Sequence, residues 1–297
     1  MNLSLIDRLR AGEILISDGA LGTMLQAAGL EPGVCPESWN LDHPERIEAI
    51  ARAYAEAGSD AVETNTFGAN RFKLRHYKFE NKVVEFNRSA VSITRRAIGP
   101  NRIVLGSVGP TGVILMMGEV GEDELYEAFR EQCLALAGAG ADVICIETMT
   151  ALDEATIATR AAKENTTLEV ICTMTFDKTL QGDFRTMMGV SPEEMVVALR
   201  AAGADIIGTN CGNGMENMVP IVEAIRKADP DIPILVHANA GRPHLWDGRN
   251  VFDETPEITA SYVPALIAAG AGIIGGCCGT TPEHIRAIRM AVKKRGG

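Results

Sequence analysis

The stretch Ala137-Gly138-Ala139-Gly140-Ala141-Asp142-Val143-Ile144-Cys145-Ile146-Glu147 joins an Ala- and Gly-rich helix end to a short apolar run that ends in an acid. Similar helix ends occur at residues 55–60, 200–205 and 267–272, and they lead into the runs 61–64, 206–209 and 273–276. A glycine at each helix exit fits the left-handed C-terminal cap of a helix. This weak repeat predicts alternating helices and strands.

Four further apolar runs, at residues 14–18, 103–107, 169–175 and 234–239, complete a set of eight candidate strands. Short strands that alternate with helices predict βαβ units and a parallel sheet. With no linker-like stretch between the units, we expect a single-domain (β/α)₈ TIM barrel over residues 1–297. A doubly wound open sheet is less favoured, because Asp18-Gly19-Ala20-Leu21-Gly22 does not match the glycine fingerprint of that fold.

Helix starts are readable at several places. Ser191-Pro192-Glu193-Glu194 offers an N-cap, a proline at the first helical position and a glutamate at the third. Asp42, with Glu45 three residues later, is expected to cap another helix in the same manner.

Composition excludes several classes of protein. The 297 residues are 46% hydrophobic and 23% charged, so the chain is not disordered. Its 28 Lys and Arg against 39 Asp and Glu give a formal charge of −11, and we expect no nucleic-acid partner. The uncharged segment 258–282 is interrupted by proline and glycines, which indicates a helix followed by a buried strand rather than a membrane span.

Cysteine usage favours a reducing, cytoplasmic location. The chain has seven cysteines, an odd number, and no signal-peptide pattern at its start. Four of them, Cys35, Cys133, Cys145 and Cys172, are interpreted as buried small side chains.

Polar residues collect where the predicted strands end, which is where barrels carry their functional sites. These residues are Asp18, Glu63, Thr64, Asn65, Ser107, Glu147, Thr148, Thr173, Thr175, Asn210, Cys211, Asn239, Cys277 and Cys278. The pattern predicts one site at the C-terminal rim of the barrel.

Cys211, Cys277 and Cys278 are candidate metal ligands, since a catalytic zinc commonly keeps three protein ligands and an open fourth position. Adjacent cysteines on a regular strand point to opposite faces, so Cys277 and Cys278 can share an ion only if the chain turns there. The neighbouring glycines, Gly276 and Gly279, permit such a turn. The thiols alone leave open that the pair is a coincidence of small strand-end residues.

The motifs around these residues resemble the homocysteine S-methyltransferase family over essentially the whole chain. Within that family they are most similar to the N-terminal homocysteine-binding domain of cobalamin-dependent methionine synthases. The matching segments are residues 18–23, 64–68, 109–112, 147–148, 210–212, 239–241 and 275–282.

The resemblance implies roles for individual residues. Cys211, Cys277 and Cys278 would bind Zn²⁺ and activate the substrate thiol. Asp18 and Glu147 would hold the amino group of homocysteine, and Asn239 would sit beside the metal, as a possible ligand when substrate is absent. The backbone at Gly22 and Thr23 would receive the carboxylate. A free thiol has a pKa of ~8.5, and a metal that deprotonates it supplies the nucleophilic thiolate without a general base.

The methyl donor is less defined. Residues 67–74 and 174–177 resemble the branch that uses a methyl-corrinoid, but no Asp-x-His-x-x-Gly cobalamin-binding motif occurs. We therefore expect methylcobalamin or another methyl-corrinoid to be carried by a separate protein, unless this chain is a domain excised from a longer one. The alternatives are S-methylmethionine, S-adenosylmethionine or betaine as donor, another thiol as acceptor, and a non-catalytic zinc- and homocysteine-binding module. A zinc hydrolase is disfavoured, because three thiolates suit that chemistry poorly.

Other rim residues receive structural interpretations. Glu63 is expected to be a structural acid, and His237 a hydrogen-bonded side chain that fills the barrel interior. The pairs Met116-Met117 and Met187-Met188 are interpreted as packing and loop residues, with an apolar lip for a partner as the alternative.

Overall fold

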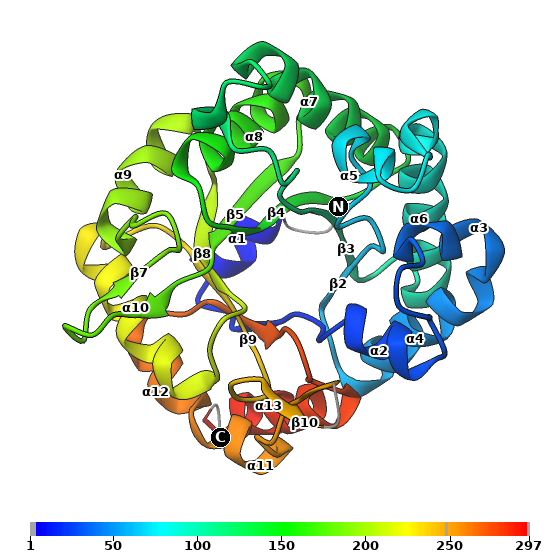
Figure 1. Ribbon diagram of the computed structural model, residues 1–297. Coiled ribbons are helices and arrows are strands. Elements are labelled where there is room, and N and C mark those ends of the chain that lie inside the picture. Colours follow the sequence, from blue (N-terminus) through cyan, green and yellow to red (C-terminus); the bar gives the residue numbers. More distant parts are fainter. Residues whose placement is uncertain (1–3, 247–248, 296–297) are drawn as a thin grey trace.

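The computed structural model describes residues 4–246 and 249–295. Eight parallel strands form the wall of a nearly closed barrel, in the order β1-β12-β9-β8-β5-β4-β3-β2. Helices surround this wall, as the view in Figure 1 shows. The predicted (β/α)₈ TIM-barrel fold is confirmed. The boundary of the domain at 1–297 stays a prediction, since both ends lie outside the described residues.

All eight predicted strands are present, most with ends within one residue of the expected ones. The barrel strands are β1 (Leu15–Ile16), β2 (Ala61–Glu63), β3 (Ile103–Val108), β4 (Val143–Met149), β5 (Glu169–Met174), β8 (Ile206–Asn210), β9 (Ile234–Ala238) and β12 (Ile273–Gly276). Two short hairpins lie outside the barrel wall, β6 (Asp177–Lys178) with β7 (Phe184–Arg185) and β10 (His244–Trp246) with β11 (Arg249–Val251).

The helices fill the connections between the strands. They are α1 (Leu5–Arg10), α2 (Gly22–Ala27), α3 (Trp39–Asp42), α4 (Pro44–Ala57), α5 (Arg71–Arg75), α6 (Val83–Ile98), α7 (Glu122–Gly138), α8 (Leu152–Asn165), α9 (Pro192–Ala202), α10 (Met215–Ala228), α11 (Pro256–Ser261), α12 (Val263–Ala269) and α13 (Pro282–Arg295). Single 3₁₀ turns occur at η1 (Pro36–Ser38), η2 (Glu80–Lys82) and η3 (Leu115–Met117).

Strand β1 is shorter than predicted, because side chains replace part of its pairing with β2. The backbone N–H of Asp60 donates to the carbonyl of Ile16 at 2.7 Å, and the Ile16 N–H donates to the Asp60 carboxylate at 2.9 Å. Closer to the C-terminal ends of the two strands, the N–H of Glu63 donates to Oδ2 of Asp18 at 2.9 Å. These contacts join the two end strands and close the barrel.

The N-terminal end of the barrel is filled with apolar side chains, among them Leu15, Leu105, Ile171 and Ile273. Helix α1 covers this end, and its first two N–H groups donate to the carboxylate of Glu169 at 3.0 and 3.1 Å. A second and larger apolar cluster lies between the strands and the surrounding helices. The barrel interior is therefore filled at this end, and a ligand inside the barrel would lie toward the opposite end.

Two helix starts test the predicted caps. Ser191 forms the expected capping box with Glu194 at the start of α9. The prediction for Asp42 is wrong: this residue ends α3, and α4 begins at Pro44 after His43. Proline is favoured at the first helical position, which fixes the start of α4 one residue beyond the expected place.

The uncharged segment folds as predicted, into α12 followed by the buried strand β12. In the described part of the chain, no helix has both the length and the apolar character to cross a membrane. Cys35, Cys133, Cys145 and Cys172 are buried, as expected.

Candidate active site

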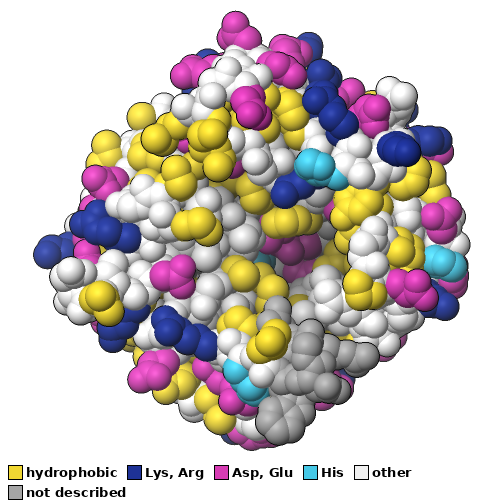
Figure 2. Space-filling view, viewed as in Figure 1, with side chains coloured by type: hydrophobic (Ala, Val, Ile, Leu, Met, Phe, Trp, Pro, Cys, Tyr) yellow, Lys and Arg dark blue, Asp and Glu magenta, His cyan; other side chains and the backbone are white. Residues whose placement is uncertain are grey.

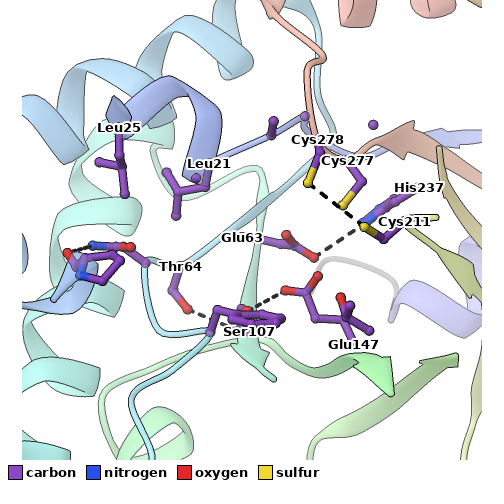
Figure 3. A pocket seen from close by; sticks show the side chains of 18 of the residues that line it. Leu21, Leu25, Glu63, Thr64, Ser107, Glu147, Cys211, His237, Cys277 and Cys278 are labelled. Atoms are coloured by element: carbon purple, nitrogen blue, oxygen red, sulfur yellow. Dashed lines mark hydrogen bonds and ion pairs between the residues drawn. The ribbon is translucent and has the colours of Figure 1, made fainter. Parts of the chain in front are cut away.

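Three thiols meet at the C-terminal rim of the barrel. Cys211 directly follows β8, and Cys277 and Cys278 directly follow β12. Their sulfur atoms all lie within 4.8 Å of one another, and the Sγ atoms of Cys211 and Cys278 are 4.0 Å apart (Figure 3). A tetrahedral zinc with bonds of ~2.3 Å to sulfur separates its ligands by about 3.8 Å. The spacing of the thiols therefore suits a shared metal ion.

The backbone turns at both cysteine segments. Cys211 has a φ of 61°, a left-handed conformation that is uncommon for residues other than glycine. After β12, the N–H of Thr280 donates to the carbonyl of Cys277 at 3.1 Å, and Gly279 has a φ of 81°. This turn is the one that the sequence predicts, and it brings both adjacent cysteines to one side. Non-glycine residues in such conformations concentrate at functional sites.

The cluster can ionise only partly by itself. Hydrogen bonds from the other two thiols lower the pKa of Cys211 to about 3. The pKa of Cys278 rises to about 12, and that of Cys277 rises as well, because each hydrogen-bonds to Cys211 and a second thiolate would lie beside its charge. A bound divalent cation removes this repulsion, since metal binding deprotonates coordinating thiols.

Asn239 lies beside the thiols at the end of β9. The Asn239 side chain is among the groups that lower the pKa of Cys211, and it is 2% exposed. Its Oδ1 atom has no hydrogen-bond partner among the described residues. A buried oxygen without a partner next to three sulfurs fits a site that accepts a cation.

A cavity of about 250 Å³ opens next to the thiols. Figure 2 shows the hollow at the centre of this face, with acidic side chains inside it. Among the described residues that line the cavity, none is a lysine or an arginine. The lining comprises Gly19, Ala20, Leu21, Gly22, Leu25, Pro36, Glu37, Glu63, Thr64, Asn65, Phe67, Ser107, Glu147, Thr148, Cys211, His237, Gly276, Cys277 and Cys278.

Glu147 reaches the cavity from β4 and is held by two neighbours. The hydroxyl of Ser107 donates to Oε1 at 2.5 Å, and the amide of Asn210 donates to Oε2 at 3.3 Å. Burial, more than any other cause, raises the pKa of Glu147 to about 7. A nearby ammonium group would favour its ionised form.

Asn210 also fixes the backbone beyond Glu147. Its Oδ1 accepts hydrogen bonds from the N–H of Thr148 at 2.8 Å and from the hydroxyl of Thr173 at 2.7 Å. Thr148 has a φ of 60°, so this contact supports a second left-handed residue at the site. Asn210 thereby links β4, β5 and β8 under the cavity.

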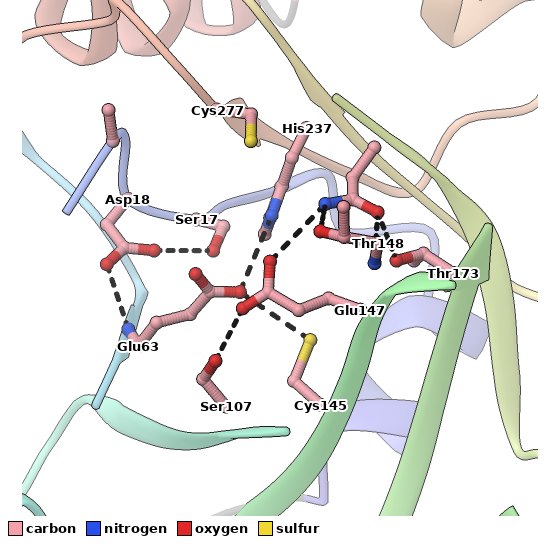
Figure 4. A network of polar contacts seen from close by, with 12 residues as sticks. Ser17, Asp18, Glu63, Ser107, Cys145, Glu147, Thr148, Thr173, His237 and Cys277 are labelled. Carbon is pink, nitrogen blue, oxygen red and sulfur yellow. Dashed lines mark hydrogen bonds and ion pairs between the residues drawn. The ribbon is translucent and has the colours of Figure 1, made fainter. Parts of the chain in front are cut away.

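Asp18 and Glu63 share the wall between β1 and β2, as Figure 4 shows. Asp18 is buried, and its two oxygens accept hydrogen bonds from the Ser17 hydroxyl at 3.1 Å and from the Glu63 N–H at 2.9 Å. Asp18 does not line the cavity, whereas Glu63 does. Burial raises the pKa of Asp18 to about 7. Burial also raises the pKa of Glu63, and the nearby carboxyl groups of Glu147 and Asp18 add to this effect.

His237 faces the cavity from β9 and is 1% exposed. Its Nδ1 lies 3.6 Å from Oε1 of Glu63, and its Nε2 has no hydrogen-bond partner among the described residues. The prediction of a hydrogen-bonded core histidine is therefore wrong in part: the ring is buried in the barrel, but it borders an open space. Burial lowers the pKa of His237 to about 4, so the ring is neutral at neutral pH.

Gly22 and Thr23 begin α2 at the edge of the cavity. Gly22 lines it, and the hydroxyl of Thr23 accepts a hydrogen bond of 3.3 Å from the N–H of Gly279, next to Cys278. The two residues lie near the thiols, and their role toward a carboxylate stays a prediction.

The methionine pairs are not packing residues. Met116 and Met187 are more than four-fifths exposed, at 82% and 81%, and their neighbours Met117 and Met188 are also exposed. They lie in loops that follow β3 and β5, on the same rim as the cavity. An apolar lip, the alternative interpretation of these pairs, describes them better.

Sequence reasoning assigned no role to Ser107 or Asn210, and it treated Glu63 as structural. All three are polar residues at predicted strand ends, and this position is the signal that could have identified them. The structure brings them into contact with Glu147, Thr148 and His237 at or below the cavity.

Known proteins of one family resemble this chain. Residues 15–292 match the family model described as homocysteine S-methyltransferase. The chain is 33% identical to the methionine synthase of Mycobacterium tuberculosis and 32% identical to that of Mycobacterium leprae, over 94% and 96% of its length. It spans about a quarter of the length of these relatives, 24% and 25%.

Solved structures show the same fold. The homocysteine methyltransferase MmuM from Escherichia coli, in its oxidized and metallated forms, superposes with a TM-score of 0.79 at 24% identity. The oxidized form is matched over 97% of this chain and 99% of that one. The family match over residues 15–292 and the methionine synthase relatives show that the chain belongs to the homocysteine S-methyltransferase family, a family of methyltransferase enzymes.

Proposed function

We propose that this chain is a zinc-dependent methyltransferase that transfers a methyl group to the sulfur of homocysteine and so forms methionine. The observation that carries this proposal is the convergence of Cys211, Cys277 and Cys278 beside a cavity that contains Glu147. The family membership and the metallated form of MmuM support it.

The three cysteines would hold the metal. Their soft sulfur ligands, their mutual distances within 4.8 Å and the unpartnered oxygen of Asn239 all fit a zinc ion with room for a further ligand. Bound there, zinc would lower the pKa of an incoming thiol and keep the sulfur as a nucleophilic thiolate at neutral pH.

The rest of the cavity would bind and orient the substrate. Glu147, fixed by Ser107 and Asn210, is placed to accept the ammonium group of an amino acid. The α-carboxylate is assigned to the backbone at Gly22 and Thr23, and Asp18 contributes to the amino-group site directly or through its neighbours. The cavity has several carboxyl groups and no lysine or arginine among its described residues. It therefore disfavours a thiol acceptor that carries a net negative charge.

We further propose that the methyl donor is a methyl-corrinoid such as methylcobalamin, presented by a separate corrinoid protein. The similarity to methionine synthases supports this donor. The exposed side chains of Met116, Met117 and Met187 on the rim support docking of a protein there, since flexible methionines suit adaptable interfaces. Cytoplasmic location is proposed because seven cysteines, an odd number, favour a reducing compartment.

One assay tests the activity and the donor together. Zinc-loaded protein is incubated with homocysteine and, in separate reactions, with methylcobalamin, S-methylmethionine, S-adenosylmethionine or betaine. Methionine is quantified, and cobalamin absorbance is followed in the first reaction. We expect methionine and demethylated cobalamin in equal amounts. Methionine from another donor alone would replace the corrinoid proposal, and binding of zinc and homocysteine without methionine from any donor would leave only a binding module.

A further inference from the structure

Two segments at the rim form walls of the same cavity. Residues 19–23, named here the first loop, lead from β1 into α2, and residues 277–280, named here the metal turn, directly follow β12. Figure 3 shows Leu21 of the first loop and both cysteines of the metal turn at this cavity. Among the described residues, backbone pairing between the two strands ends where the N–H of Gly276 donates to the carbonyl of Asp18 at 2.8 Å. Beyond that point, side-chain hydroxyls join the two segments.

The hydroxyl of Thr280 joins the metal turn to the first loop. It donates to the carbonyl of Cys277 at 2.7 Å and accepts from the N–H of Ala20 at 3.0 Å. Thr280 is fully buried, so loss of its hydroxyl would leave the Ala20 N–H without this partner and away from water, which is costly. One side chain therefore fixes a carbonyl of the metal turn and an amide of the first loop relative to each other.

The hydroxyl of Tyr54 contacts the same two segments. This side chain reaches them from α4 and is 1% exposed. Its hydroxyl donates to the carbonyl of Ala20 at 2.7 Å, and the carbonyl of Thr280 is a second, more distant acceptor at 3.2 Å. A third hydroxyl, on Thr23, accepts from the N–H of Gly279 at 3.3 Å. Three hydroxyl groups thus bridge the first loop and the metal turn.

The packing around these hydroxyls is tight. A Cβ atom at Gly19 would lie 2.7 Å from Oγ1 of Thr280 and 2.8 Å from Cε1 of Tyr54, and a Cβ atom at Gly276 would lie 2.3 Å from the same Oγ1. These separations are shorter than van der Waals contact, so glycine is required at both positions. Because closely packed interiors transmit strain, a shift of the metal turn would displace the first loop as well.

Neither hydroxyl-bearing side chain reaches a ligand directly. Tyr54 and Thr280 are not among the described residues that line the cavity, whereas Ala20 and Cys277 are. In the proposed reaction, the sulfur of homocysteine binds at the metal turn and its carboxylate binds at the first loop. The spacing of the two segments must therefore match the length of the substrate, and productive geometry tolerates deviations of only about 0.5 Å.

We propose that Tyr54 and Thr280 are positioning residues that couple the metal turn to the first loop, so that zinc binding at the cysteines also orders the loop that receives the substrate carboxylate. The part that concerns homocysteine rests on the proposed function. The coupling between the metal and the loop requires no turnover, and it can be measured separately.

Hydrogen exchange of backbone amides tests the coupling. The exchange rate of the Ala20 amide is measured by NMR in metal-free and zinc-saturated protein, and the ratio of the two rates is compared between the wild type, Thr280→Val, Thr280→Ser and Thr159→Val. The proposed metal ligands lie outside the first loop, so protection there must be transmitted to it. Thr159 provides the matched control: it is fully buried on α8, donates to the carbonyl of Ala155 at 2.8 Å and does not line the cavity.

In the wild type, zinc should slow exchange of the Ala20 amide roughly fivefold or more, since a ligand that binds the ordered turn stabilises it by mass action. Thr280→Val should lose most of this protection and bind zinc roughly tenfold more weakly, as for loss of an outer contact to a metal ligand. Thr280→Ser retains the hydroxyl and should restore both properties, and Thr159→Val should behave as the wild type. Should Thr280→Val not fold, Tyr54→Phe replaces it in this experiment, with a smaller expected loss.

Binding of two thiols to the zinc-loaded protein tests the consequence for the substrate. Homocysteine and 3-aminopropane-1-thiol share the thiol, the chain and the ammonium group, but only homocysteine carries the carboxylate. Tyr54→Phe removes a hydroxyl and keeps the ring. By calorimetry it should weaken homocysteine binding roughly threefold to tenfold and binding of 3-aminopropane-1-thiol less than about twofold, because one hydrogen bond that fixes the first loop is lost.

Other results would overturn the inference. Equal zinc-dependent protection of Ala20 in Thr280→Val and the wild type, or none in the wild type, would mean that the two segments are independent. Equal weakening of both thiols by Tyr54→Phe, or no weakening, would give Tyr54 a purely structural role. A wild-type protein in which zinc protects Ala20, but which neither binds nor methylates homocysteine, would refute the proposed function and leave the coupling in place.

Discussion

The hydroxyl of Ser107 donates a hydrogen bond of 2.5 Å to Oε1 of Glu147, across the boundary between β3 and β4. Both residues line the cavity beside the thiols. This contact stabilises the ionised form of a carboxyl group whose pKa burial raises to about 7. Ser107 therefore orients the Glu147 side chain and favours its ionised form, and Glu147 is the acid that we assign to the substrate ammonium group.

Replacing Ser107 by alanine should weaken homocysteine binding without removing zinc. We expect KM for homocysteine to rise roughly threefold to tenfold at pH 7, because the variant loses a hydrogen bond to a charged group. The defect should shrink at pH 8.5, where Glu147 is ionised even without this bond. Steady-state kinetics at both pH values check the prediction, and a defect that grows with pH would contradict it.

The fold could be predicted because its signals are local. Each strand is a short apolar run, and glycines such as Gly58 and Gly203 end the preceding helices in left-handed conformations. The length of β1 could not be predicted, because the Asp60 and Asp18 carboxylates replace part of its ladder across more than 40 residues of sequence. Such long-range replacement leaves no pattern in the sequence of the strand itself.

The thiol cluster could also be predicted, since cysteines at the ends of barrel strands lie on the same rim, and the structure brings these three together. The positions of Asp18 and Glu63 relative to the cavity could not. Asp18 is turned away from the cavity because its carboxylate accepts the backbone N–H of Glu63. This contact depends on how the two end strands close the barrel. The same holds for His237, whose Nε2 has no hydrogen-bond partner in the described part of the chain.

Replacing Cys277 by serine should remove most of the bound zinc while the barrel stays folded. The cluster lies on the rim, and the apolar interior at the other end of the barrel does not depend on it. Elemental analysis should show one zinc per wild-type chain and much less in the variant, and circular dichroism should show the same helical content in both.

Cys133→Ala is the matched control, because Cys133 is fully buried in α7 and lies outside the cluster. It should keep its zinc. Full zinc occupancy in Cys277→Ser would reject the ligand set, and global unfolding of that variant would indicate a structural metal.

Replacing Glu147 by alanine should raise the homocysteine concentration needed for activity. The loss of a charged partner in a buried site is expected to raise KM roughly tenfold or more, with zinc content unchanged. Initial rates over a range of homocysteine concentrations provide the measurement. An unchanged KM would remove Glu147 from the substrate site.

The buried carboxyl groups also predict how stability depends on pH. The pKa values of Asp18 and Glu147 rise from 3.8 and 4.5 to about 7 in the folded protein, mainly through burial. Between about pH 4.5 and pH 7 the folded state therefore holds more protons than the unfolded state. Stability is fully present below the unfolded pKa values and falls as the pH rises through the folded ones.

Urea unfolding of the metal-free protein at pH 5, 6.5 and 8 measures this dependence. We expect the midpoint to fall across the series in the wild type, because ionising buried carboxyl groups near one another is costly. In Glu147→Gln this side chain no longer titrates, so the free energy of unfolding should fall less with pH than in the wild type. The difference between the two proteins should reach roughly 3 kcal/mol at most. Parallel curves for the two proteins would mean that Glu147 is not protonated in the folded state. In that case its carboxylate is stabilised by the existing donors alone, and no ammonium ligand is needed to ionise it.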